Sequence, residues 1–221
     1  MKQLLFRLSA AAWLVAPSCA ANSPPPAQPR VPRVVLVHGI METGNSLNYM
    51  RRHLEKRGFD CYIPKMTPCD GRGGLENLAT RLKEDIDQHF GIREPVSIVA
   101  FSMGGLVTRY YLQDLGGAKR CSQLITISSP HNGTKAAWLY PSKGAVQMRP
   151  GSQFLENLQS TENQLGKMPV TSYRTPMDLI ILPPTSSVWE RADNQEYPIL
   201  MHPLMITSKR VINDIEQRLL R

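Results

Sequence analysis

The chain has 221 residues, of which 42% are hydrophobic and 20% are charged, and its formal net charge is +8 at pH 7. This length and composition fit one soluble globular domain with a sizeable core, and no apolar run is long enough to span a bilayer. The basic residues are scattered and accompany no nucleic-acid motif, which argues against a nucleic-acid partner. They predict a solvated basic surface or, as the weaker alternative, association with an anionic membrane surface.

The N-terminus has the order of a secretory signal, which we expect over residues 1–20. Lys2 and Arg7 precede the apolar stretch LSAAAWLVA, which ends at the small residues PSCAA. A first helix of the domain is the alternative, but the proline-rich segment 21–32 that follows cannot continue a helix. The sequence therefore predicts an exported protein, periplasmic or secreted, with a linker over 21–32 and one domain over 33–221.

The signal allows two processing outcomes. Cleavage after Ala20 or Ala21 would release the protein. Cleavage before Cys19 would leave a lipid-anchored cysteine, with the linker as a spacer, although the preceding Pro17 does not favour it.

Three cysteines lie in the expected domain. An exported location permits a disulfide, and Cys61 and Cys69, eight positions apart around a proline-containing loop, are the first candidates for a pair. Cys121 would then stay unpaired unless Cys19 is also retained, and the connectivity cannot be fixed from sequence. The cysteine spacing fits no zinc pattern, and we expect no metal or other cofactor.

Strand-like and helix-like segments alternate after the linker. Short apolar runs predict strands at 33–37, 59–63, 96–101, 123–128, 169–174 and 197–201. Apolar residues at helical spacing predict helices at 46–58, 75–91, 103–117 and 208–221. This alternation predicts an α/β fold with a mainly parallel sheet covered by helices on both faces. Segment 131–167 breaks the rhythm and is expected to cover one side of the sheet's carboxyl edge.

Ser102 stands where the third strand should end and a helix begin, in the stretch AFSMG. This is a close relative of G-x-S-x-G, in which a strained turn projects a nucleophilic hydroxyl above the sheet. The small residues Ala100 and Gly104 leave room for that turn, and Gly105 lets the helix lie close to the strand. An ordinary serine N-cap is the alternative, whereas the phosphate-binding glycine motifs are absent from this stretch.

A serine nucleophile needs a histidine base and an acid that orients it. Only His131 and His202 follow Ser102, and His202 stands at the end of the last expected strand, where the base belongs. Asp178, soon after the 169–174 strand, is the expected acid. The other acidic candidates follow in a more polar loop: Glu190, Asp193 and Glu196.

Two backbone amides are expected to stabilise an oxyanion. The amide of Met103 lies in the first turn of the helix after Ser102, whose positive end suits a developing negative charge. The second should come from the loop after the first strand, in VLVHGI, where Ile40 is the candidate and Met41 the alternative.

Together the segments HGI, AFSMGG and SSPHNGT, with an aspartate before a hydrophobic pair, resemble the small, lid-poor bacterial lipases and esterases of the α/β-hydrolase superfamily. The resemblance covers about residues 33–221. It implies a catalytic triad of Ser102, Asp178 and His202, with oxyanion amides at Ile40 and Met103. It implies a supporting role near the site for His131.

The activity expected from this resemblance is hydrolysis of a lipid or short acyl ester through an acyl-enzyme. The alternatives are an acyltransferase, thioesterase or amidase with the same triad, or a hydrolase-fold protein without turnover that binds lipid or acts like a chaperone. Chain-length preference, physiological substrate and oligomeric state cannot be read from the sequence.

Overall fold

The structure is a computed structural model, and it describes residues 31–221. The expected signal over 1–20 and nearly all of the expected linker lie outside the described residues. No helix within 31–221 has both the length and the apolar character that crossing a membrane requires.

Six strands form one sheet in the order β2-β1-β3-β4-β5-β6, and every neighbouring pair is parallel. The strands are β1 (Arg33–Val37), β2 (Asp60–Tyr62), β3 (Val96–Phe101), β4 (Cys121–Ile127), β5 (Val170–Arg174) and β6 (Asp193–Glu196). The expected parallel sheet is therefore confirmed, and all the loops that follow the strands emerge at one edge.

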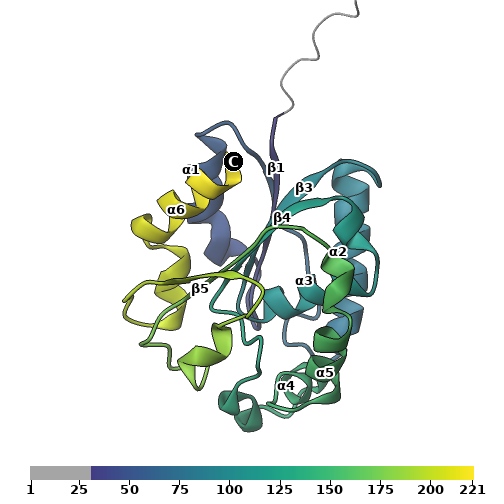
Figure 1. The fold of residues 1–221 in the computed structure, drawn as a ribbon, viewed down its shortest axis with the longest axis vertical. Coiled ribbons are helices and arrows are strands. Elements are labelled where there is room, and N and C mark those ends of the chain that lie inside the picture. Colours follow the sequence, from purple (N-terminus) through teal and green to yellow (C-terminus); the bar gives the residue numbers. More distant parts are fainter. Residues whose placement is uncertain (1–30) are drawn as a thin grey trace, which may run out of the picture. The chain divides into compact units, whose positions relative to one another are not determined.

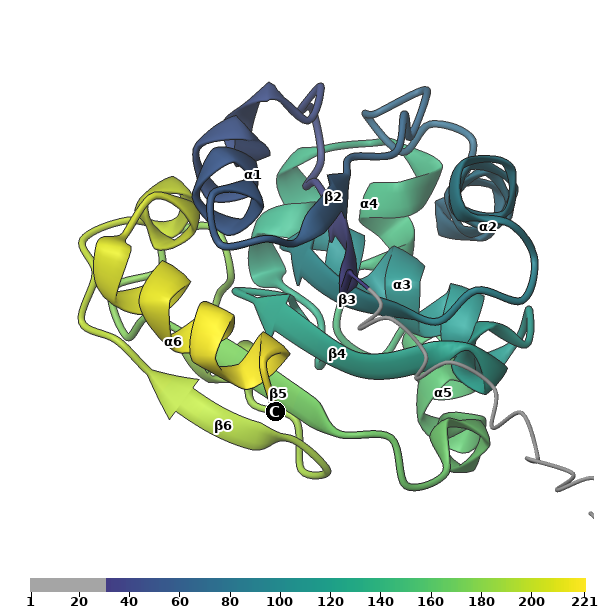
Figure 2. The ribbon, with the colours of Figure 1, turned by 90° about the horizontal axis from the view of Figure 1, so that it is seen from above.

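Helices cover both faces of this sheet. The α-helices are α1 (Asn48–Glu55), α2 (Leu75–Phe90), α3 (Met103–Gln113), α4 (Lys143–Gln147), α5 (Gln153–Ser160) and α6 (Lys209–Leu219). Short 3-10 helices are η1 (Asn45–Leu47), η2 (Gly117–Lys119), η3 (Lys135–Leu139), η4 (Glu162–Leu165), η5 (Pro184–Ser187) and η6 (His202–Ile206). Helices α1 and α6 lie on one face, and α2, α3 and α5 lie on the other (Figures 1 and 2).

The core has two halves because the central strands are buried on both sides. In β1, Val35 and Val37 belong to the cluster under α2 and α3, whereas Val34 and Leu36 belong to the cluster under α1 and α6. Successive side chains of a strand point to opposite faces, so a continuous apolar run serves both halves.

Segment 131–167 crosses from β4 to β5 as η3, α4, α5 and η4, and it does cover one side of the carboxyl edge (Figure 1). Two serines begin its α-helices. The Ser142 hydroxyl accepts from the Ala145 amide at 3.1 Å, and that of Ser152 accepts from the Leu155 amide at 3.4 Å.

Two expectations were wrong. Residues 197–201 do not form the last strand, which is the polar segment DNQE over Asp193–Glu196. As an edge strand β6 needs no buried face, while Tyr197 and Ile199 are apolar because they pack against the core from outside the sheet.

The second error concerns the disulfide: Cys61, Cys69 and Cys121 are free thiols. The Cys61 side chain packs against the core cluster under α1 and α6 instead of pairing with Cys69.

Candidate functional site

Ser102 lies on a tight turn between β3 and α3. Its backbone has φ 54° and ψ −126°, in the left-handed half of conformational space that residues other than glycine seldom adopt. The turn is held by the Ser102 amide, which donates to the Ile127 carbonyl of β4 at 2.9 Å, and by the Gly105 amide, which donates to the Ser102 carbonyl at 3.0 Å. This is the strained strand-to-helix geometry that the AFSMG stretch predicts.

Two glycines let α3 begin this close to the sheet. A methyl group on Gly104 would lie 2.5 Å from the His38 carbonyl oxygen, which follows β1. One on Gly105 would lie 2.1 Å from Oγ of Ser129, which follows β4. Both distances are far below van der Waals contact, so α3 can dock over the neighbouring strands only without side chains at these positions.

Asp178 and His202 meet at the carboxyl edge from two different loops. Nδ1 of His202 lies 2.7 Å from Oδ2 of Asp178, and because a carboxylate can only accept, the imidazole donates this bond. Both side chains are buried, with residue exposures of 3% for Asp178 and 6% for His202.

The second oxygen of Asp178 is held by its own loop. Oδ1 accepts the amides of Ile180 at 2.9 Å and Ile181 at 2.8 Å. Burial by itself raises the pKa of this carboxyl. The bond and charge of His202 and these two amides outweigh it, so the pKa of Asp178 lies below its usual value. Asp178 is therefore ionised at neutral pH and fixed in orientation at both oxygens.

The His202 ring lies beside the serine turn. Its centroid is 4.7 Å from that of Phe101, the residue directly before Ser102. His202 begins η6, and Met201 before it has φ 95°, a strained value that turns the chain sharply between β6 and this short helix. The structure therefore brings Ser102, Asp178 and His202 to the same edge of the sheet.

The loop after β1 lies against the same turn. A methyl group on Gly39 would lie 3.1 Å from Cβ of Ser102, closer than ordinary van der Waals contact, so the loop is packed tightly against the turn. The Met41 amide donates to the Cys69 carbonyl at 2.8 Å, which removes it as an oxyanion donor. No acceptor for the amides of Ile40 or Met103 occurs among residues 31–221, so these two remain available to a ligand.

Glu42 is a residue of this loop that the sequence interpretation missed. Its Oε2 accepts the Gly39 amide at 2.9 Å and the Ser46 hydroxyl at 3.0 Å. Together with the ring nitrogen Nδ1 of His38, which lies 2.9 Å from the Gly39 carbonyl oxygen, it fixes the peptide groups on either side of Gly39. The only sequence signal was a carboxylate three positions after the glycine of HGI.

The competing acids lie in other surroundings. Asp193, in β6, pairs with Nη1 of Arg218 at 2.6 Å, and Glu196 pairs with Arg174. Glu190 lines a separate cleft, described next. Among the acidic candidates, Asp178 is the one that contacts His202.

His131 is not in contact with this group. It is buried on the α3 side of the sheet, where Nε2 lies 3.0 Å from Oγ1 of Thr126 and Nδ1 lies 3.5 Å from Nη1 of Arg109. Its ring packs on Trp189, with centroids 4.6 Å apart. Burial, and then the charge of Arg109, hold the pKa of His131 well below its usual value, so the ring is neutral.

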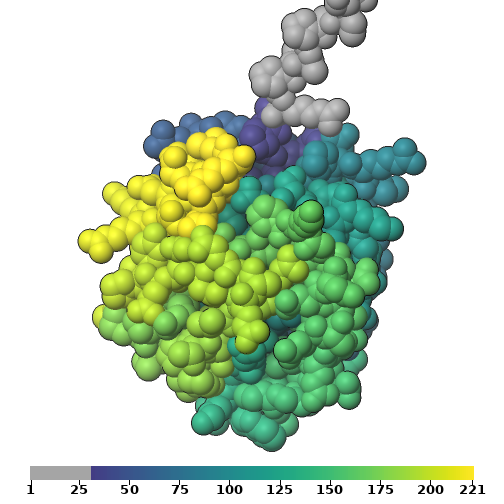
Figure 3. Space-filling model, viewed as in Figure 1, coloured from purple at the N-terminus to yellow at the C-terminus, as the bar shows by residue number. Residues whose placement is uncertain are grey.

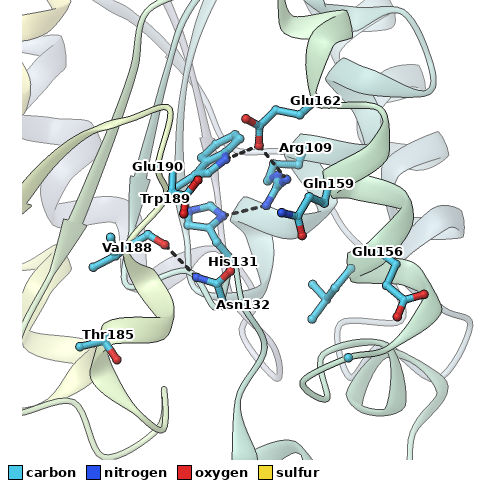
Figure 4. A pocket seen from close by; sticks show the side chains of 12 residues that line it. Arg109, His131, Asn132, Glu156, Gln159, Glu162, Thr185, Val188, Trp189 and Glu190 are labelled. Atoms are coloured by element: carbon cyan, nitrogen blue, oxygen red, sulfur yellow. Dashed lines mark hydrogen bonds and ion pairs between the residues drawn. The ribbon is translucent and has the colours of Figure 1, made fainter.

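Arg109 and His131 form the floor of a cleft of about 770 Å³ between α5 and the segment before β6 (Figures 3 and 4). The Arg109 guanidinium packs over Trp189 at 4.1 Å and donates to the Leu158 carbonyl at 3.0 Å. None of the lining residues is Ser102, Asp178 or His202, so the cleft is separate from the serine site.

No three His, Cys, Asp or Glu side chains within residues 31–221 are grouped as metal ligands would be. What the serine site offers is a hydroxyl on a strained turn, a carboxylate-bound imidazole and two free amides, the components of nucleophilic catalysis at a carbonyl.

Residues 32–217 match the family model of the alpha/beta hydrolase fold, and the chain belongs to that family. No curated protein matches it. Solved structures with a similar fold include the mature Bacillus licheniformis lipase BlEst2, at 20% identity and a TM-score of 0.71, covering 90% of this chain and 94% of that one.

Two further structures are similar. The Paleococcus ferrophilus monoacylglycerol lipase has 15% identity and a TM-score of 0.67, over 86% of this chain and 95% of that one. A pyrethroid hydrolase from Sphingobium faniae has 14% identity and a TM-score of 0.58, over 86% and 98%. At these identities the likeness concerns the fold.

Proposed function

We propose that this protein is a serine hydrolase of carboxylic esters, with lipid or short acyl esters as substrates. The observation that carries the proposal is the buried Asp178–His202 hydrogen bond, whose imidazole lies against the residue preceding the strained Ser102. Membership of the α/β-hydrolase family supports it, as do similar folds in proteins described as lipases and as a pyrethroid hydrolase.

In the proposed mechanism His202 takes the Ser102 proton while Oγ attacks the ester carbonyl carbon. Asp178 holds the ring in the tautomer with hydrogen on Nδ1, which leaves Nε2 free to accept that proton, and it stabilises the imidazolium that forms. The amides of Ile40 and Met103 donate to the oxyanion. Each such donor typically contributes about 10²–10³ in rate.

The intermediate then collapses. The ester C–O bond breaks, His202 returns the proton to the departing alcohol, and an acyl-Ser102 ester remains. Water attacks this ester while His202 takes its proton, and His202 then returns the proton to Oγ as the Oγ–acyl bond breaks and the carboxylic acid leaves. An acyltransferase, thioesterase or amidase would use the same residues with another acceptor or leaving group.

The direct test is turnover of a chromogenic ester series of increasing acyl length by the wild type and by Ser102→Ala. We expect the wild type to hydrolyse at least one ester and the variant to lose about 10⁴-fold or more in kcat. A phosphonate ester should add one adduct to the wild type, at Ser102. Wild-type turnover in Ser102→Ala would refute the proposal, and faster product formation with added alcohols would favour acyl transfer.

We also propose export through the N-terminal segment. Mass spectrometry of the protein made in a bacterial host would find a new N-terminus after Ala20 or Ala21, or a lipidated Cys19 if the anchored alternative is correct. An uncleaved chain would contradict both.

A further inference from the structure

Most of the large apolar side chains that are exposed within residues 31–221 lie at the catalytic edge of the molecule. They come from the segments after four strands, including those that carry Asp178 and His202: Met41, Trp138, Leu139, Val146, Met177, Leu179, Ile180, Leu200, Met201 and Leu204. Single apolar residues scattered over a surface are normal. Apolar residues gathered on one side of a protein instead mark a site of association.

The most exposed of these lie on residues 135–149, which we call the crossover cap and which comprise η3, α4 and their connections. Leu139 is 87% exposed and Trp138 is 64% exposed. The cap lies at the lower end of the molecule in Figure 1, beyond the carboxyl ends of the strands.

The cap is also basic. Lys135 and Lys143 are exposed and Arg149 is half-buried, while the sequence has no Asp or Glu between Asp114 and Glu156. From outside the cap, Oε2 of Glu76 in α2 lies 3.8 Å from Nζ of Lys143, and within residues 31–221 neither Lys135 nor Arg149 forms an ion pair. The Arg149 guanidinium covers one face of the Trp138 ring at 4.1 Å, which holds the ring without burying it. Cations around an exposed tryptophan and leucine are the combination that suits the boundary between anionic headgroups and acyl chains.

The cap is joined to the serine site through one loop. The Gly144 amide at the start of α4 donates to the Gly71 carbonyl at 2.8 Å. A methyl group on Gly71 would lie 3.3 Å from Cα of Gly144 and 3.7 Å from Sδ of Met103, the residue after Ser102. The start of α4 is therefore packed, through Gly71, against the residue that follows Ser102.

We infer that the crossover cap docks the protein on an anionic phospholipid bilayer, with Trp138 and Leu139 inserted among the acyl chains and Lys135, Lys143 and Arg149 at the headgroups. Docking would deliver membrane-borne esters to Ser102, and this purpose rests on the proposed function. The binding itself is independent of the proposed function, because it can be measured without turnover.

The test is flotation of the full chain carrying Ser102→Ala with vesicles of phosphatidylcholine, alone or mixed with phosphatidylglycerol. We expect binding that requires phosphatidylglycerol and weakens with salt. In this background Lys135→Ala with Lys143→Ala should weaken binding about 30-fold, at about fivefold per lysine. Leu139→Asp should weaken it by roughly tenfold or more.

Matched controls lie at the other edge of the sheet. Ile92→Asp changes a side chain that is 75% exposed in the loop before β3, and Lys56→Ala with Lys167→Ala removes two exposed lysines. Both should bind as the parent does. Equal losses in cap and control variants, no loss in the cap variants, or no preference for phosphatidylglycerol would overturn the inference.

Turnover separates this inference from the proposed function. With Ser102 intact, the cap variants should hydrolyse a soluble short ester at the wild-type rate, which also shows that they fold. Cap-dependent binding by a protein that cleaves no ester would refute the proposed function and leave the docking surface standing.

Discussion

Nδ1 of His202 lies 2.7 Å from Oδ2 of Asp178, although 24 positions separate the two residues in the chain. The contact forms because both residues lie on the segments after β5 and β6, which are neighbouring parallel strands and deliver their loops to one edge. With Nδ1 bonded to the carboxylate, the opposite ring nitrogen, Nε2, is left without that partner.

Asp178→Asn tests this contact against the alternative acid. An amide in place of the carboxylate can donate to Nδ1 and stabilise the wrong tautomer, so we expect kcat for a short ester to fall about 10⁴-fold with little change in fold. Asp193→Asn should leave kcat unchanged because Asp193 pairs with Arg218. A larger loss from Asp193→Asn would reverse the assignment.

The same variant has a predicted effect on stability. The pKa of Asp178 is lower in the folded protein, so its ionisation stabilises the fold above the unfolded pKa, and this contribution is lost as pH falls through the folded pKa. The difference in unfolding free energy between wild type and Asp178→Asn should therefore shrink on acidification below about pH 4. Urea denaturation at several pH values measures this difference in unfolding free energy. A difference that grows on acidification would contradict a lowered pKa of Asp178.

Glu42→Ala should loosen the loop that carries the Ile40 amide. The Gly39 amide and the Ser46 hydroxyl would lose a charged acceptor, and the freed peptide could turn away from the oxyanion. We expect kcat to fall about tenfold with KM nearly unchanged, because the lost interaction belongs to the transition state. Glu42→Gln keeps an acceptor and should recover most of the activity. A rise in KM alone would assign Glu42 to substrate binding.

Gly104→Ala should destabilise the whole domain. The added methyl group would lie 2.5 Å from the His38 carbonyl oxygen, so α3 must move away from β1, at a cost of about 1–3 kcal/mol. Gly73→Ala is the control, since a methyl group there would approach no atom closer than 3.6 Å. The midpoints of chemical denaturation of both variants measure the effect. Equal decreases in the two midpoints would contradict a steric clash between position 104 and the His38 carbonyl.

His131→Gln should weaken the pH dependence of the free energy of unfolding below about pH 6.5. Burial and the charge of Arg109 lower the pKa of His131 in the folded protein. At a pH below the pKa of this histidine in the unfolded chain, the unfolded chain therefore binds a proton that the folded protein does not bind. Wild-type stability should fall by up to about 1.4 kcal/mol per pH unit from this group below about pH 6.5. The variant lacks that contribution but loses stability at neutral pH, where it disturbs the contacts with Thr126 and Arg109. Parallel profiles would contradict a neutral buried imidazole.

Much of the fold was predictable because its signals are local. The buried run RVVLV coincides with β1 and VSIVAF with β3, since a central parallel strand must be apolar on both faces. The last strand was not predictable in this way. An edge strand such as DNQE is held by backbone bonds to β5 and has no side-chain pattern, whereas YPILM is apolar for packing that takes place outside the sheet.

By itself the sequence determined the parallel α/β architecture, the serine turn and the residues to consider as base and acid, because these follow from periodicity, small residues and chain order. The tertiary structure decided which acid contacts His202, that Glu42 anchors the loop of Ile40, that His131 lies with Arg109 in a separate cleft, and that the cysteines stay apart. Each of these depends on how far two loops extend beyond the sheet edge and how their side chains pack. Such distances are set by contacts across the whole domain and leave no mark in the local order of residues.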